Sequence, residues 1–247
     1  MTDFEIQAGW QSVLGRILAD ARRLGHRGVL AFDLDSTLLD NRPRQAALVQ
    51  RYVRERGGSP ALANFDVRHL HTGFDMREAL VRQGLGTDEA QRFLADFRPY
   101  WREHFFTSEA CTADVPVAGA VEYVRDAFAS GAELAYVTAR PEAMRKGTVD
   151  VLGRHGFPLP GERVQLWMKA DASVSDEDFK RSTHRLLSSR GQVLAAFDNE
   201  PMHANDYRAS FPEATVVLLA TGHSGRERTL ADGILAVPHF AVSATEG

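Results

Sequence analysis

Short apolar runs that alternate with helical segments are the feature of this sequence that most constrains its fold. Several of these runs are apolar at nearly every position, as is typical of strands covered on both faces. Six segments fit buried strands: 28–33, 132–138, 164–168, 192–198, 214–219 and 234–237. Helical periodicity lies between them and also over 4–24, before the first strand. The pattern predicts an α/β fold in which a parallel sheet is flanked by helices.

A helical stretch interrupts this alternation after the first predicted strand. Residues 41–114 contain no convincing strand, and helical patterns cover much of their length: 44–56, 76–83 and 88–106. We therefore expect a core formed by residues 1–40 and 115–247, with a small all-helical domain over 41–114. The alternative is that these helices extend the helical layer of the core.

Charge and cysteine content argue against several classes of protein. The 247 residues include 29 basic and 33 acidic side chains, and the net charge of −4 argues against a general nucleic-acid binder. Cys111 is the single cysteine, so no disulfide can form within the chain, and a reducing compartment, the cytoplasm, is expected. The first ten residues lack a basic start and an apolar stretch, so we expect no secretory signal. No apolar run approaches the roughly 18 residues of a membrane span, and none is expected.

The first predicted strand leads directly into two acids, Asp33 and Asp35, in the segment FDLDST. Two carboxylates at the end of a buried strand suit a hard cation, which prefers oxygen ligands. They also suit a carboxylate nucleophile that forms an aspartyl-phosphate. An acid-rich turn that starts a helix would have the same composition. This motif alone therefore leaves both interpretations open.

Two further predicted strands end in polar residues, Thr138 and Asp198. In open parallel sheets, binding sites lie beyond the carboxyl ends of the strands, so these residues and Asp33 are expected at one edge. Lysine occurs at three positions only: Lys146, Lys169 and Lys180. Ser175 and Asp178 form a helix-start signature just before Lys180, which places that lysine near the beginning of the helix before Asp198.

Taken in order, these motifs resemble those of the haloacid dehalogenase (HAD) superfamily, whose members are mostly phosphatases. The first motif is DLDST from Asp33, the second is YVTAR around Thr138, and the fourth is FDNEP around Asp198. The third is a basic residue on the helix before the fourth strand, for which we choose Lys180. Lys169 and Arg181 are the alternatives. The resemblance covers about 28–40 and 117–219 and implies a Rossmann-like core with a helical cap.

The resemblance assigns chemical roles to individual residues. Asp33 is similar to the nucleophile that attacks phosphorus, and Asp35 to the general acid/base. Thr138 is similar to the hydroxyl that binds a phosphoryl oxygen, and Lys180 to the cation that neutralises the phosphate. Apart from the resemblance, the position of Arg140 in the loop after Thr138 suits contact with an anion of the substrate, the alternative being an arginine that faces solvent.

The resemblance also implies Mg²⁺ as the cofactor. The Asp33 carboxylate, the backbone carbonyl of Asp35 and the Asp198 carboxylate would hold it, and Asn199 offers a further oxygen. Many members of the superfamily have a second acid where this chain has Asn199. Whether Glu200 or Asp206 joins the metal site stays open.

We therefore expect a magnesium-dependent phosphomonoester hydrolase that acts on a small phosphorylated substrate through an aspartyl-phosphate on Asp33. The open alternatives are a phosphomutase, a polynucleotide end phosphatase and a non-catalytic phosphate-binding module. The helical stretch resembles a cap that closes over the site and selects the substrate. Its cluster of arginines and aromatic residues over 98–104 either contributes to recognition or, with Trp101 and Phe105, packs as the core of the cap. Neither the substrate nor the oligomeric state follows from the sequence.

Overall fold

A six-stranded sheet forms the centre of the protein, whose computed structural model describes residues 4–170, 173–227 and 229–242. Its strand order is β5-β4-β1-β6-β7-β8, and every neighbouring pair is parallel. The strands are β1 (Gly28–Phe32), β4 (Glu133–Pro141), β5 (Val164–Lys169), β6 (Gln192–Asp198), β7 (Thr215–Leu219) and β8 (Leu235–Val237). All six predicted strands are confirmed, with bounds that shift by three residues at most.

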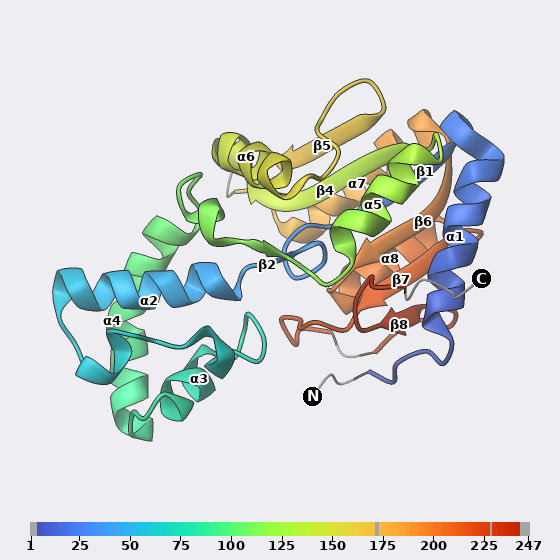
Figure 1. Ribbon diagram of the computed structural model, residues 1–247. Helices are drawn as coiled ribbons and strands as arrows, with labels where there is room; N and C mark the ends of the chain where they lie inside the picture. The colour runs from blue at the N-terminus through green and yellow to red at the C-terminus, as the bar shows by residue number, and fades with distance from the viewer. Residues whose placement is uncertain (1–3, 171–172, 228, 243–247) are drawn as a thin grey trace.

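Helices cover both faces of this sheet (Figure 1). One face carries α1 (Trp10–Leu24), α5 (Ala120–Ala129) and α6 (Arg145–His155), and the other carries α7 (Asp176–Arg190) and α8 (Pro201–Ser210). Side chains alternate along a strand. Leu30 and Phe32 of β1 therefore join the hydrophobic cluster under α1 and α5, whereas Val29 and Ala31 join the cluster under α7 and α8. This three-layer arrangement confirms the predicted α/β fold.

The first helix is shorter than its periodicity suggested. It begins at Trp10, because Gly9 takes a left-handed conformation with φ 66° that a helix does not continue through. The preceding segment runs beside β8, where the Gln7 N–H donates to the Ala236 carbonyl at 2.9 Å. The prediction of a helix over 4–9 was therefore wrong. Ile6 packs against the core from this non-helical segment and does not belong to a helix face.

Residues 41–114, called the helical insertion below, leave the core after β1 and return before α5. Three helices account for much of them: α2 (Arg42–Arg56), α3 (Met76–Arg82) and α4 (Thr87–Phe105). They enclose a hydrophobic cluster of their own, which includes Val49, Phe65 and Phe97. Figure 1 shows them as a lobe to one side of the sheet. The three helices predicted here are confirmed to within two residues at each end.

Two short strands connect the helical insertion to the core. β2 (Leu39–Asp40) and β3 (Val115–Pro116) form an antiparallel pair in which Asp40 lies opposite Val115. The sequence did not predict them, because two residues are too few to show a period. A second connection lies at Gly222, where an added Cβ would come within 2.8 Å of Thr72 in the insertion. The insertion thus contacts the core both at its stem and at the loop after β7.

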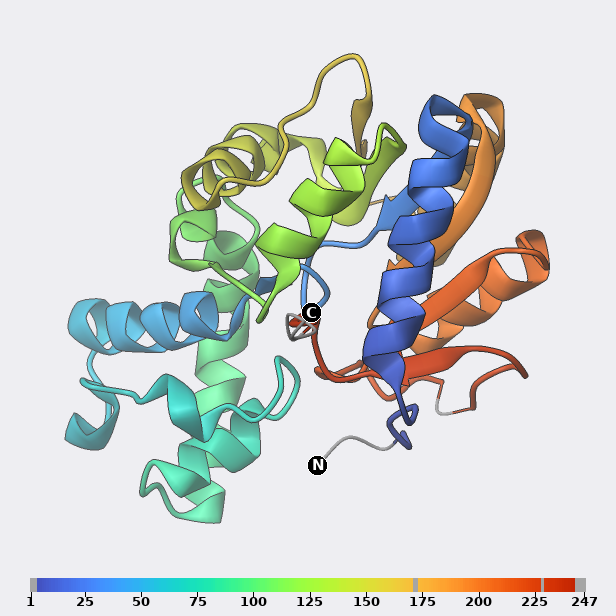
Figure 2. The same cartoon turned by 45° about the vertical axis from the view of Figure 1, so that its right-hand side comes forward.

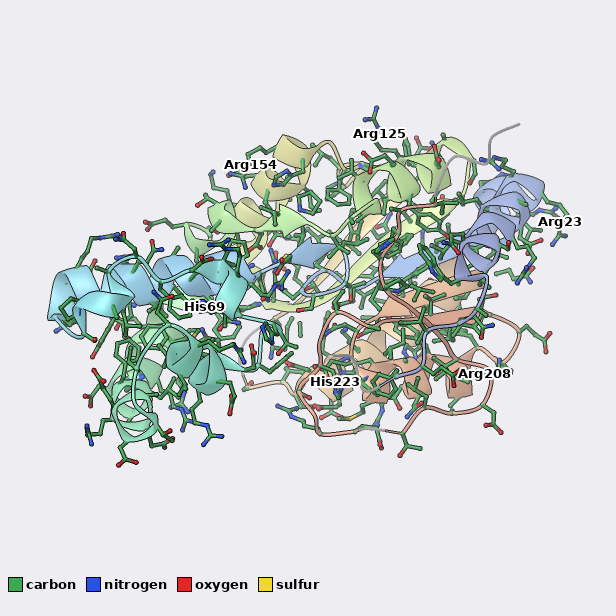
Figure 3. The ribbon with its side chains drawn as sticks, turned by 60° about the horizontal axis from the view of Figure 1, so that its bottom comes forward. Arg23, His69, Arg125, Arg154, Arg208 and His223 are labelled. Atoms are coloured by element: carbon green, nitrogen blue, oxygen red, sulfur yellow. The ribbon has the colours of Figure 1, made fainter. Side chains whose placement is uncertain are left out.

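The outer helix faces of the core are rich in arginine. In Figure 2, α1 and α5 lie in front of the sheet, and Figure 3 shows Arg23 and Arg125 projecting outward from these two helices. Both side chains belong to exposed residues. Within the part of the chain that the structure describes, no helix combines the length and the apolar character needed to cross a membrane.

Candidate active site

Asp33 lies at the carboxyl edge of the sheet, directly after β1. Its N–H donates to the Phe197 carbonyl at 2.9 Å, so the residue is still held against β6. β6 ends at Asp198, and the two carboxylates lie side by side and buried. The Lys180 ammonium joins them, with Nζ 2.8 Å from Asp33 Oδ1 and 2.6 Å from Asp198 Oδ2.

The position of Lys180 follows from the start of α7. The Ser175 hydroxyl oxygen accepts a hydrogen bond from the Asp178 N–H at 3.0 Å, as in the predicted helix start. Lys180 then points toward the sheet on the buried face of α7, which also carries Thr183 and Leu187.

The two alternatives to Lys180 have other partners. Lys169 ends β5 and contacts Asp176 at 2.6 Å, and Arg181 contacts Asp206 at 2.9 Å on the surface. The structure therefore places Lys180, of the three candidates, against Asp33 and Asp198.

Burial and charge set the protonation of this trio. Burial raises the pKa of Asp33 to about 7, helped by repulsion from Asp198 and Asp35, and the attraction of Lys180 offsets this only in part. Burial also opposes the charged form of Asp198, but Lys180 outweighs it and holds the pKa of Asp198 below its usual range. The same attraction raises the pKa of Lys180 although burial lowers it. The negative charge beside Lys180 is therefore held mainly by Asp198.

Asp35 belongs to a second group of buried charges. The Arg140 guanidinium donates to both of its oxygens, from Nε to Oδ2 at 2.7 Å and from Nη2 to Oδ1 at 2.8 Å. Arg140 also donates to Asp114 Oδ2 at 2.7 Å, and Asp114 accepts two further hydrogen bonds from Arg44 of α2. Arg44 lies 3.4 Å from Asp35 as well, which closes the group. We call these four residues the stem network: Asp35, Arg44, Asp114 and Arg140.

Arg140 contacts side chains of the protein, whereas the sequence predicted that it contacts an anion of the substrate. Its side chain is 2 % exposed, and its nitrogens donate to Asp35, Asp114 and the Thr148 hydroxyl. In this structure it therefore positions Asp35. Burial raises the pKa of Asp35, but attraction to Arg140 and the hydrogen bonds from it outweigh burial, so this pKa lies well below the usual range.

Arg44 and Asp114 were missed as site residues. They lie 70 positions apart in the sequence, and neither is part of a recognisable motif. Nothing local to either residue predicts the pair, because the contact arises only when α2 packs beside the stem.

The remaining site residues surround the same edge. Thr138 is buried at the carboxyl end of β4, and its hydroxyl oxygen accepts from the Arg140 N–H at 3.3 Å. Asn199 Oδ1 accepts from the Thr37 hydroxyl at 3.3 Å, and its Nδ2 donates to the Gly222 carbonyl at 2.6 Å. Glu200 accepts from the N–H and the hydroxyl of Ser224, at 2.7 and 2.9 Å. The amide of Asn199 thus ties the first motif to the loop after β7.

A cavity of about 530 Å³ opens above these residues, between the core and the helical insertion. We call it the central cavity. The core side of its wall includes residues of all four sequence motifs: Asp33, Asp35, Thr138, Lys180 and Asn199. The insertion contributes aromatic side chains: Phe74, Trp101, Phe105 and Phe106. The cavity is therefore polar at its base and aromatic at its mouth.

Comparisons with known proteins agree with this fold. No family model matches the chain. A putative nucleotidase from Bacillus cereus is 27 % identical over 143 residues, which are 58 % of this chain and 67 % of that protein. The crystal structure of a putative phosphatase from Clostridium difficile has a TM-score of 0.53 at 12 % identity, over 86 % of this chain and 94 % of the other. The structure of protein tyrosine kinase A from Mycobacterium tuberculosis has a TM-score of 0.50 at 18 % identity, over 85 % and 92 %.

The sheet order, the insertion after β1 and the likeness to the Clostridium difficile structure decide the fold. The chain has the haloacid dehalogenase fold. This confirms the fold that the motifs implied, and residues of all four motifs line one cavity.

Proposed function

We propose that the protein is a phosphomonoester hydrolase that acts through an aspartyl-phosphate on Asp33. The observation that carries this proposal is the placement of Asp33. It lines the central cavity together with residues of the other three motifs, and its Oδ1 lies 2.8 Å from Lys180 Nζ. The similarity to a phosphatase structure and to a putative nucleotidase supports the same reaction class.

The first half of the reaction forms the covalent intermediate. An oxygen of the Asp33 carboxylate attacks phosphorus, the bond from phosphorus to the ester oxygen breaks, and Asp35 gives its proton to that leaving oxygen. Lys180 and the Thr138 hydroxyl face the charge that develops on the phosphoryl oxygens. Without Lys180, the carboxylate and the phosphate would repel each other in a buried site.

The second half restores the enzyme. Asp35 takes a proton from a water molecule, the water oxygen bonds to phosphorus, and the bond from phosphorus to Asp33 breaks to release inorganic phosphate. The contact with Arg140 keeps Asp35 ionised, which is the form that this step needs. To act as the acid in the first half, the Asp35 carboxyl has to separate from Arg140.

The donor set at this edge fits Mg²⁺. Asp33 and Asp35 line the central cavity, and the buried Asp198 shares Lys180 with Asp33, while Asp35 is paired with Arg140. Among the described residues, no group of three or more His, Cys, Asp or Glu side chains is placed to hold a metal ion by itself. Mg²⁺ commonly uses only one or two protein carboxylates together with water and substrate phosphate. Asp33 and Asp198 with the Asp35 carbonyl would hold it, and it would draw charge from the phosphoryl oxygens.

The mouth of the central cavity favours a leaving group with a flat apolar part. Phe74 and Phe106 are 54 % and 44 % exposed there and lie in the same wall as Trp101 and Phe105, so together they offer an aromatic surface to a ligand. A nucleotide has such a flat part, and the Bacillus cereus relative is named as a putative nucleotidase. Nucleoside monophosphates are therefore the first substrates to test.

The test replaces Asp33 by Asn, which keeps the shape and removes the nucleophile. We expect phosphate release from an aryl phosphate and from nucleoside monophosphates to fall by several orders of magnitude. Acid-quenched wild-type protein should gain the mass of one phosphoryl group on Asp33, and the variant should not. Asp20→Asn, at an exposed acid of α1, is the matched control. Turnover retained by Asp33→Asn, or phosphate found on another residue, would contradict the mechanism.

A further inference from the structure

A second cavity lies inside the helical insertion, between α4 and the start of α3. Its volume is about 570 Å³, similar to that of the central cavity. We call it the insertion cavity. Four residues line both cavities: Gln45, Phe74, Trp101 and Arg102. The two cavities therefore adjoin at these four residues.

The insertion cavity has an excess of positive charge. Arg77 and Glu78 both line it and pair with each other at 2.7 Å, so their charges compensate. Arg98 and Arg102 also line it, and neither has an ion pair or a side-chain hydrogen bond within residues 4–170, 173–227 and 229–242. The two arginines are four positions apart on α4, where like charges repel. The folded chain thus places two solvent-exposed guanidinium groups without a carboxylate partner at one cavity.

Trp101 marks the junction of the two cavities. Its indole Nε1 is buried and finds no hydrogen-bond acceptor in the described part of the protein. Buried donors normally have a partner. This nitrogen is covered by protein, so the two arginines without a carboxylate are the groups that an acceptor-rich anion would contact.

We propose that Arg98 and Arg102 bind a second phosphate group, carried by the leaving group of the substrate. Two guanidinium groups match the charge of a phosphate, and arginine forms paired hydrogen bonds with its oxygens. The substrate is then a bisphosphate: one phosphate is attacked by Asp33 and the other is held in the insertion cavity. This inference rests on the proposed phosphatase function and adds the substrate class.

The test compares bisphosphates of linear diols, with three to six carbons between the oxygens, with the monophosphates of the same diols. Phosphate release with Mg²⁺ gives kcat/KM for each pair of compounds. We expect wild-type protein to prefer the bisphosphate of at least one length by tenfold or more. Arg98→Ala and Arg102→Ala should each reduce this ratio, and the double variant should bring it close to one.

Arg92→Ala is the matched control, because Arg92 is exposed on α4 and does not line the cavity. It should keep the wild-type ratio. Added salt should lower the ratio in wild-type protein, since exposed charges are screened. Equal turnover of both compounds by wild-type protein, or a preference that survives in the double variant, would overturn the second phosphate site. If neither compound is hydrolysed and no phosphoryl group appears on Asp33, the proposed function itself fails.

Discussion

The two groups of buried charge meet at the same cavity, but they join different parts of the molecule. Asp33, Lys180 and Asp198 all belong to the core, and Lys180 connects two strand ends through one ammonium group. The stem network also includes Arg44 from α2 and Asp114 from the stem. The first group has an excess of negative charge, which suits a metal cation. The second is balanced, with two arginines against two acids, which suits a structural connection.

This difference predicts whether a substitution should alter the chemistry or the free energy of unfolding. A neutral, isosteric change at Asp33 should alter the chemistry and leave the folded structure largely intact, because Lys180 keeps Asp198 as its partner. A change in the stem network should alter the free energy of unfolding, because it leaves a charge buried without a partner.

Removal of divalent metal should have the largest effect on activity and should leave the ion pairs of the stem network in place. We expect a chelator to abolish phosphate release and Mg²⁺ to restore it. Ca²⁺ should restore little, because it prefers more ligands and a looser geometry. Steady-state phosphate release and thermal unfolding, measured on the same samples, would separate chemistry from stability. Full activity in chelator would remove the metal from the proposed mechanism.

Asp114→Ala should have the largest effect on stability. It leaves the guanidinium groups of Arg44 and Arg140 without their shared carboxylate, and both side chains are at most 2 % exposed. Breaking a buried ion pair typically costs about 3–5 kcal/mol in free energy of unfolding. Urea unfolding with a constant m-value would measure it. Asp126→Ala, at an exposed acid of α5, is the control. A loss below about 1 kcal/mol would mean that the stem network does not hold the two parts together.

Lys180→Ala tests the buried charges of the core, Asp33, Lys180 and Asp198. Losing the ammonium leaves Asp33, Asp198 and the phosphate to repel one another, so kcat/KM should fall at least about a hundredfold, or roughly 2.7 kcal/mol. Lys169→Ala should lose far less, because Lys169 contacts Asp176 and not Asp33. Steady-state kinetics of both variants at one pH and saturating Mg²⁺ would decide between them. A larger loss in Lys169→Ala would show that the third motif is misplaced.

His184 should give the smallest effect, and it belongs to neither group. It is buried between α7 and α8, and burial lowers its pKa. The unfolded chain therefore binds a proton more readily than the folded one. His184 should therefore contribute to the free energy of unfolding above the ordinary histidine pKa of about 6.5. This contribution should decrease as the pH falls below that value. Unfolding of wild-type protein and His184→Gln between pH 7.5 and 5.5 would show it as a shallower dependence in the variant.

The sequence predicted the parts of the site that depend on local pattern. Asp33, Thr138 and Asp198 each follow an apolar run, and the strand order then brings them to one edge. Lys180 could be chosen because a helix-start signature fixes its distance from Asp198. These residues could be predicted because each lies at the end of a strand or the start of a helix, and the positions of such ends follow from the fold.

The stem network could not be predicted in this way. The partners of Arg140 depend on how α2 packs beside the stem, and no periodicity in the sequence encodes that packing. Arg140 was therefore expected to face the substrate, although the structure pairs it with Asp35 and Asp114. The non-helical segment before Trp10 was missed for the same reason. Its contact with β8 joins residues that are far apart in the sequence.

The pairing of β2 with β3 also bears on how such a chain could be rebuilt. Antiparallel strands can be joined by a turn of two residues, and Asp40 lies opposite Val115. Residues 41–114 could thus be excised, or exchanged for a segment of another length, through a single graft point that leaves β1 and α5 in register. The excised segment contains both Arg44 and Asp114, one cation and one anion. A minimal protein made in this way would keep Asp35 and Arg140 as a neutral pair, whereas Asp40 would lose its partner Arg42.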